Sequence, residues 1–191
     1  MFIAMQYLGM AIRGNPYMGV GRNLAYRRSL FFRNKGFGAH SQLASGDDDL
    51  IVNSNATGEN IKVEFGQETH TRSVPAATIR ELFKQKKRHL TTAVHYKLNH
   101  KVILTVEPVT RVLFYALFAV LLSSLYFWPF VTAIFTVRLA VQVVVLILVQ
   151  KKLNEPGLAP WSIFYDIISP VLNAVIYLTN LGEGSRKNRW K

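Results

Sequence analysis

The chain has 191 residues, half of them hydrophobic, and its 23 Lys and Arg against 11 Asp and Glu give a formal net charge of +12. This apolar content excludes a disordered basic tail, because such tails lack the apolar residues needed to build a core. Cysteine is absent, which excludes a disulfide framework and a thiolate metal site.

Residues 1 to about 105 mix polar and apolar residues around glycine-rich turns, and we expect part of an α/β domain here. NLAYRRSLFF, residues 23–32, predicts a strand that runs into a short helix. DDLIVNSNAT, residues 48–57, predicts a helix with acidic residues at its start, and NIKVEF, residues 60–65, predicts a strand. About 105 residues are few for a complete catalytic α/β domain.

The next segment is SVPAATIRELFKQKKRHLTT, residues 73–92, and it predicts an amphipathic helix that we place at 76–96. Lys86 falls within its apolar face, where a long lysine side chain can reach back to water at a membrane surface. Gln85, Arg88 and His89 form a polar edge that can present an amide, a guanidinium and an imidazole to one ligand. A basic helix of this kind is also typical of a simple contact with anionic lipid.

The strongest hydrophobic signal is Val112–Gln150, a run of about 39 residues whose only charged residue is Arg138. At 1.5 Å rise per residue the run would extend roughly 58 Å as a helix, about twice the thickness of a hydrocarbon core. It therefore predicts two transmembrane helices within 109–150, joined by a turn near Trp128 and Pro129.

Basic residues flank this pair of helices at both ends, and the turn between them has none. The positive-inside rule therefore places the preceding domain and the linker after residue 150 on the cytoplasmic side of a cell membrane. A third hydrophobic segment, residues 161–181, contains Asp166 and precedes the basic tail RKNRWK. We favour an interfacial or re-entrant segment there over a third span, because a span would bury Asp166 in hydrocarbon and place the basic tail outside.

Three consecutive aspartates, Asp47, Asp48 and Asp49, stand at the start of the helix predicted after residue 47. Taken alone, they are typical of a helix N-terminus, where the helix dipole stabilises negative charge. MGVGRN, residues 18–23, lacks the G-x-G-x-x-G spacing and favours a turn over a phosphate cradle. The five histidines lack metal-ligand spacing, and no metal site is predicted within the chain.

Taken in order, these segments resemble the C-terminal half of the membrane-bound family 2 glycosyltransferases, the group that includes cellulose, chitin and hyaluronan synthases. GVGRNLAYRRSLFF, GDDDL and ETHTRSVPAATIRELFKQKKRHL precede the paired membrane spans, and the resemblance covers nearly the whole chain. Gly19–Arg28 is similar to the family's glycine-to-arginine segment, Gly46–Leu50 to its acidic motif, and Gln85–His89 to its Q-x-x-R-W motif.

The resemblance implies the C-terminal part of a GT-A catalytic domain and an inverting transfer of a sugar to a lipid or glycan acceptor at the cytoplasmic membrane face. The donor would be a nucleotide sugar, UDP- or GDP-linked. Asp47 or Asp48 would be the general base, and the length of the acidic motif leaves both open. Gln85, Arg88 and His89 would bind the donor diphosphate, with His89 where the family usually has Trp. The acceptor side would comprise Gly19, Gly21, Arg22, Asn23 and Asp49.

The family's reaction normally uses a divalent cation, Mg²⁺ or Mn²⁺, held by a D-x-D motif that follows the uridine-binding strands. No D-x-D preceded by such strands occurs here, so we expect the donor-binding half and the metal ligands to lie outside this chain, and the chain alone not to transfer sugar. The alternative is a non-enzymatic membrane protein whose basic cytoplasmic domain docks on anionic lipid. Nucleic-acid binding is not expected, because Lys and Arg near membrane helices already account for the charge.

Overall fold

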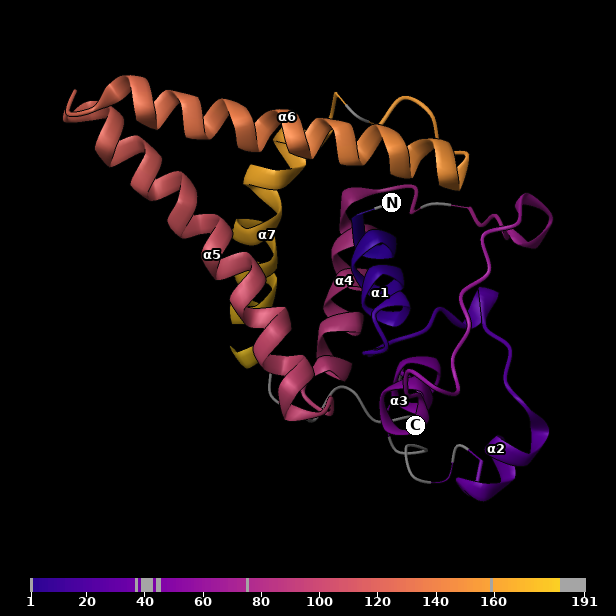
Figure 1. The fold of residues 1–191 in the computed structure, drawn as a ribbon. Helices are drawn as coiled ribbons and strands as arrows, with labels where there is room; N and C mark the ends of the chain where they lie inside the picture. Colours follow the sequence, from indigo (N-terminus) through magenta and orange to yellow (C-terminus); the bar gives the residue numbers. More distant parts are fainter. Residues whose placement is uncertain are drawn as a thin grey trace. The chain divides into compact units, whose positions relative to one another are not determined.

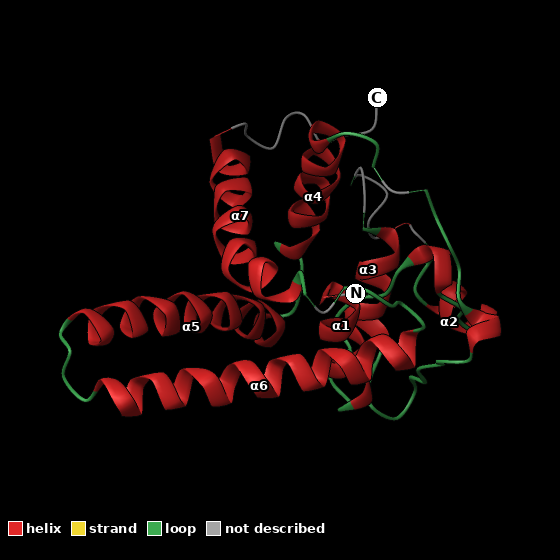
Figure 2. Ribbon diagram, turned by 90° about the horizontal axis from the view of Figure 1, so that it is seen from above, coloured by secondary structure: helices red, strands yellow, loops and turns green. Residues whose placement is uncertain are grey.

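The structure is a computed structural model that describes residues 2–36, 38, 43, 46–74, 76–158 and 160–182. Figure 1 gives the helix labels, and Figure 2 shows the same elements from above. The basic tail RKNRWK lies outside the described residues. The elements in chain order are α1 (Phe2–Ile12), the 3₁₀ turn η1 (Gly21–Asn23), α2 (Arg28–Arg33), α3 (Asp47–Asn55), the 3₁₀ turn η3 (Gln67–Thr69), α4 (Ile79–Ala93), α5 (Leu98–Ser123), α6 (Trp128–Leu153) and α7 (Ser162–Gly182).

The expectation of an α/β GT-A fold is wrong for the part of the chain that the structure describes, because that part contains helices and no strand (Figure 2). The segment predicted as a strand at 60–65 alternates as expected, with Ile61, Val63 and Phe65 half-buried and Lys62 exposed. Alternation predicts an extended chain, but a strand also needs a neighbouring strand to bond with. Here the carboxylate of Glu64 instead accepts the N–H groups of Phe65 and Gly66, each at 2.8 Å.

The helix predicted at 76–96 begins at Ile79, because a capping arrangement fixes its start. The hydroxyl of Thr78 accepts the N–H of Glu81 at 3.2 Å, and the carboxylate of Glu81 accepts the N–H of Ala77 at 3.0 Å. Two of the backbone donors near the helix start are therefore satisfied by side chains.

The chain divides into two compact units, and we describe each by itself. The first contains Phe2–Lys101 together with the end of α7 from Val175. Its core is built around α3, in which five consecutive residues, Asp49 to Asn53, are buried. A helix buried on every side needs apolar neighbours all round, and Tyr17 and Tyr96 are among the buried residues of this unit, with their rings 6.0 Å apart.

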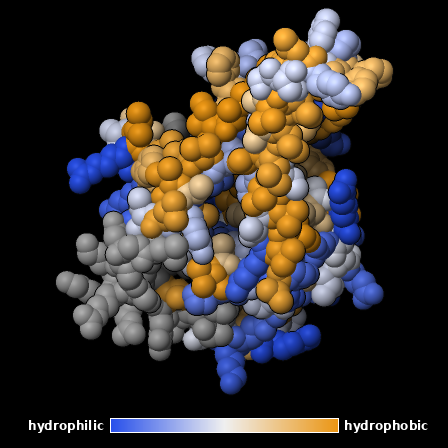
Figure 3. Space-filling view, turned by 90° about the vertical axis from the view of Figure 1, so that its left-hand side faces the viewer, coloured by the Kyte–Doolittle hydropathy of each residue, from blue (hydrophilic) through white to orange (hydrophobic). Residues whose placement is uncertain are grey.

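The second unit, Val102–Ala174, contains most of α5, all of α6 and the first part of α7. α5 and α6 are joined by a tight turn in which Leu125 and Phe127 adopt positive φ angles, and Phe118 stacks on Phe135 at 4.2 Å between ring centroids. By length and hydropathy α5, α6 and residues 162–179 of α7 can each cross a membrane, as expected of a membrane protein. Apolar side chains gather over the α5–α6 hairpin in Figure 3.

Candidate functional site

The candidate site lies in the first unit, where η1 meets the N-terminus of α3. The carboxylate of Asp48 accepts the backbone N–H of Gly21 at 2.7 Å through Oδ2 and the N–H of Asp49 at 2.9 Å through Oδ1. A Cβ at position 21 would lie 3.0 Å from the carboxylate of Asp48, so glycine permits this close approach. Two segments that are 27 residues apart are thereby joined, and Arg22 and Asn23 follow directly in the exposed turn.

The three aspartates at the start of α3 lie in different environments. Asp47 is exposed, Asp48 is half-buried, and Asp49 is only 2 % exposed. The hydroxyl of Thr92, from the end of α4, donates to Oδ2 of Asp49 at 3.4 Å, whereas Oδ1 of Asp49 has no partner among the described residues. Asp47 is therefore the aspartate of this triplet that is open to a ligand.

Burial raises the pKa of Asp49 to about 6, with a further contribution from the negative charge of Asp48. Hydrogen bonds from Tyr96 and Thr92 oppose the shift but do not cancel it. The same burial, together with the charge on Asp49, raises the pKa of Tyr96 above its ordinary value. Asp49 thus keeps its proton up to about pH 6, in a position enclosed by side chains.

Helix α4 brings the third predicted segment to this place. His89 is partly exposed, and its electrostatic neighbours are Arg88, Asp48 and Arg22. Partial burial lowers the pKa of His89, Arg88 and Arg22 lower it further, and Asp48 opposes them. The imidazole of His89 therefore favours its neutral form.

Close packing holds α4 against the start of α3. Gly46 precedes α3 with φ of 99°, and a Cβ there would lie 2.3 Å from Cγ2 of Thr92. Gly19 is buried, and a Cβ there would lie 2.9 Å from Cγ2 of Val52. Both glycines leave space that neighbouring side chains fill. Gly19, which was expected on the acceptor side, therefore acts here as a packing residue.

A buried polar network fixes the other end of α3. The side-chain amide of Asn53 donates to the carbonyl of Tyr17 at 2.8 Å and lies 2.9 Å from Nδ1 of His100, while its Oδ1 accepts the N–H of Lys97 at 2.9 Å. Nε2 of His100 lies 2.8 Å from Oδ1 of Asn15. Since the amide nitrogen of Asn53 can only donate, Nδ1 of His100 must accept and Nε2 must carry the proton. The network therefore requires a neutral His100.

The structure thus brings together residues from three of the predicted segments: Gly21 and Arg22, Asp48 and Asp49, and Arg88 and His89. Gln85 lies one turn before His89 on α4 and is half-buried. Thr92 and Tyr96, which contact Asp49, were not predicted from sequence. Thr92 follows Arg88 by four residues, and helical spacing alone would have placed it on the same face.

Among the described residues there is no group of three or more His, Asp or Glu side chains that could hold a metal ion. The expectation that ligands for Mg²⁺ or Mn²⁺ lie elsewhere stays a prediction. Comparisons with protein-family models, with curated proteins and with solved structures gave no match for this chain.

Proposed function

We propose that this chain takes part in an inverting glycosyl transfer at the cytoplasmic face of a cell membrane, from a nucleotide-sugar donor to a lipid or glycan acceptor. The observation that carries the proposal is the meeting of three sequence segments at the N-terminus of α3. Gly21 binds Asp48 at 2.7 Å, Thr92 binds Asp49 at 3.4 Å, and His89 lies in the electrostatic field of Arg22, Arg88 and Asp48. A carboxylate, two guanidinium groups and an imidazole that interact electrostatically have the composition that this reaction requires.

Asp47 is the aspartate best suited to act as general base. Both oxygens of Asp48 already accept backbone N–H groups, and Asp49 is enclosed. Asp47 is exposed at the first position of α3, where an acceptor hydroxyl can approach its carboxylate. Asp48 then serves to hold η1 in place, and Asp49 to join α3 to α4.

Arg88 and Arg22 are suited to neutralise the negative charge that builds up on the departing nucleoside diphosphate. A guanidinium group can bind two phosphate oxygens at once through parallel N–H donors. His89, which favours its neutral form, can add a hydrogen bond without repelling the two arginines. The donor's nucleoside and any divalent cation would be bound by other residues.

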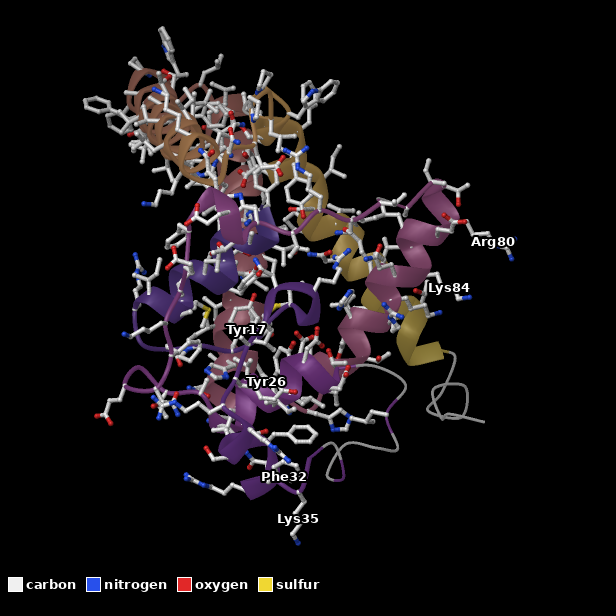
Figure 4. All side chains as sticks on the ribbon, turned by 90° about the vertical axis from the view of Figure 1, so that its right-hand side faces the viewer. Tyr17, Tyr26, Phe32, Lys35, Arg80 and Lys84 are labelled. Carbon is white, nitrogen blue, oxygen red and sulfur yellow. The ribbon has the colours of Figure 1, made fainter. Side chains whose placement is uncertain are left out.

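The test is binding of pyrophosphate, which represents the part of the donor that the two arginines would contact, to the purified chain in nanodiscs, measured by calorimetry at low salt. We expect Arg88→Gln to weaken binding at least about tenfold, since hydrogen bonds between charged groups contribute about 1.5–3 kcal/mol. Lys84→Gln is the matched control, because it removes one positive charge from the same helix at an exposed position that points outward in Figure 4. If both variants lost the same binding affinity, the loss would come from the net positive charge of the helix, and a specific diphosphate site would be refuted.

A second candidate function is docking of α4 on anionic lipid. Arg80 and Lys84 both point outward from α4 in Figure 4, and Ile79 is 79 % exposed beside them. An exposed apolar residue among basic ones suits a membrane surface. This function would be favoured if pyrophosphate did not bind and α4 became protected from hydrogen exchange only in nanodiscs with anionic lipid.

A further inference from the structure

The second unit contains a cluster of charged side chains inside its apolar helices, which we call the Asp166 cluster. It consists of Arg111 from α5, Arg138 from α6 and Asp166 from α7. Charged side chains at the centre of a membrane helix cost about 2.5–3.5 kcal/mol each by insertion scales, and they are retained where they pair with one another. Three such residues on three different helices therefore need an explanation.

Asp166 binds both arginines at once. Its Oδ2 lies 2.7 Å from Nη2 of Arg138, and its Oδ1 lies 3.3 Å from Nε of Arg111. The hydroxyl of Tyr115 donates to Oδ2 at 2.6 Å. The Asp166 side chain is only 11 % exposed, so these partners, rather than solvent, surround its carboxylate.

The arginines are held by further polar partners on the same helices. Arg138 donates to Tyr115 at 3.1 Å and to Gln142 at 3.2 Å, and its guanidinium lies 4.4 Å from the centre of the Phe114 ring. Arg111 donates to the hydroxyl of Ser169 on α7 at 2.9 Å and forms an ion pair with Glu107. Glu107 is the more exposed acid, with a side chain 42 % accessible to solvent.

We propose that Asp166 is the counter-ion that attaches α7 to the α5–α6 hairpin, so that the three helices enter the bilayer as one unit. Without α7, the hairpin would carry Arg138 within a long apolar helix with no acidic partner among these contacts. Without the hairpin, α7 would carry an unpaired aspartate four residues after its start. Two features of the sequence argued against a span at residues 161–181: the charge of Asp166 in hydrocarbon and the position of the basic tail. The ion pairs of Asp166 with the two arginines remove the first reason.

The test uses the full chain in nanodiscs with two spin labels. The sequence has no cysteine, so Leu113→Cys on α5 and Val171→Cys on α7 give a unique label pair, and both side chains are more than half exposed. We expect one narrow distance distribution in the parent and a broad or longer one after Asp166→Asn. Glu107→Gln is the matched control: it makes the same change from carboxylate to amide at a half-exposed partner of Arg111, and it should leave the distribution narrow.

A second readout covers the case in which Asp166→Asn fails to fold. We expect the membrane yield of Asp166→Asn to fall about tenfold or more, because Arg138 loses its acidic partner and Arg111 keeps only Glu107. Adding Arg138→Gln removes the unpaired charge, so the double variant should recover part of the yield. A narrow distance distribution in Asp166→Asn, or a double variant with lower yield than Asp166→Asn alone, would overturn the proposal.

Discussion

Replacing Asp49 by asparagine tests the environment at the centre of the candidate site. The pKa of Asp49 is raised from 3.8 to about 6. Between these values the folded protein holds a proton that the unfolded chain has released, so stability falls as pH rises from about 4 to 6, and the full penalty persists above pH 6. At 1.36 kcal/mol per pKa unit, the penalty is about 3 kcal/mol at neutral pH. Asparagine fills the same volume without the charge, so we expect Asp49→Asn to be more stable than the parent at pH 7.5.

The assay is thermal unfolding in nanodiscs at a series of pH values from 4 to 7.5. The variant should unfold several degrees above the parent at pH 7.5, and the difference should shrink toward pH 4. Glu59→Gln, at an exposed loop position, makes the same chemical change and should shift stability by less than about 0.5 kcal/mol. A difference between Asp49→Asn and the parent that stays constant across this pH range would refute a buried, proton-holding Asp49.

Two further substitutions test how α3 is held. Gly46→Ala should destabilise the first unit by about 1–3 kcal/mol in thermal unfolding, because it combines a left-handed backbone with a Cβ 2.3 Å from Thr92. The double variant with Thr92→Ser should recover part of this loss. The control Gly9→Ala has open space around it and should be neutral or slightly stabilising. Asn53→Ala leaves Nδ1 of His100 and the carbonyl of Tyr17 without their partner, and it should lower the free energy of unfolding by at least about 2 kcal/mol in the same assay. The control Ser54→Ala, at the exposed neighbouring position, should lower it by less than about 0.5 kcal/mol. Equal effects of Asn53→Ala and Ser54→Ala would contradict the network.

Local patterns in the sequence predicted α3, α4 and the two long apolar helices α5 and α6, but not α1. The acidic start and apolar run of 48–57 correspond to α3 at Asp47–Asn55, and the amphipathic pattern of 76–96 corresponds to α4 at Ile79–Ala93. The run from 109 to 150 corresponds to two helices long and apolar enough to cross a membrane. Helix signals of this kind depend on neighbours three and four residues apart, which the sequence displays directly.

Long-range pairing was not predictable in the same way. Whether residues 60–65 form a strand depends on a partner strand, and alternation in one segment cannot reveal one. The contact between Asp49 and Thr92 spans 43 residues, and the ion pair between Arg138 and Asp166 spans 28. From sequence alone, the charge of Asp166 argued against a membrane location for residues 161–181. Its pairing with Arg111 and Arg138 was not visible, because these two residues lie on other helices.

The measurement that tests the proposed function most directly is sugar transfer in native membranes, in which components outside this chain are present. We expect Asp47→Asn to reduce transfer from a radiolabelled nucleotide sugar at least about a hundredfold while UDP binding is unchanged, because a general base contributes about 10²–10⁴ to the rate. Asp48→Asn should lower both transfer and UDP binding, since Asp48 holds η1 and Arg22 in place. Wild-type transfer by Asp47→Asn, or membranes whose transfer activity does not depend on this chain, would contradict the account.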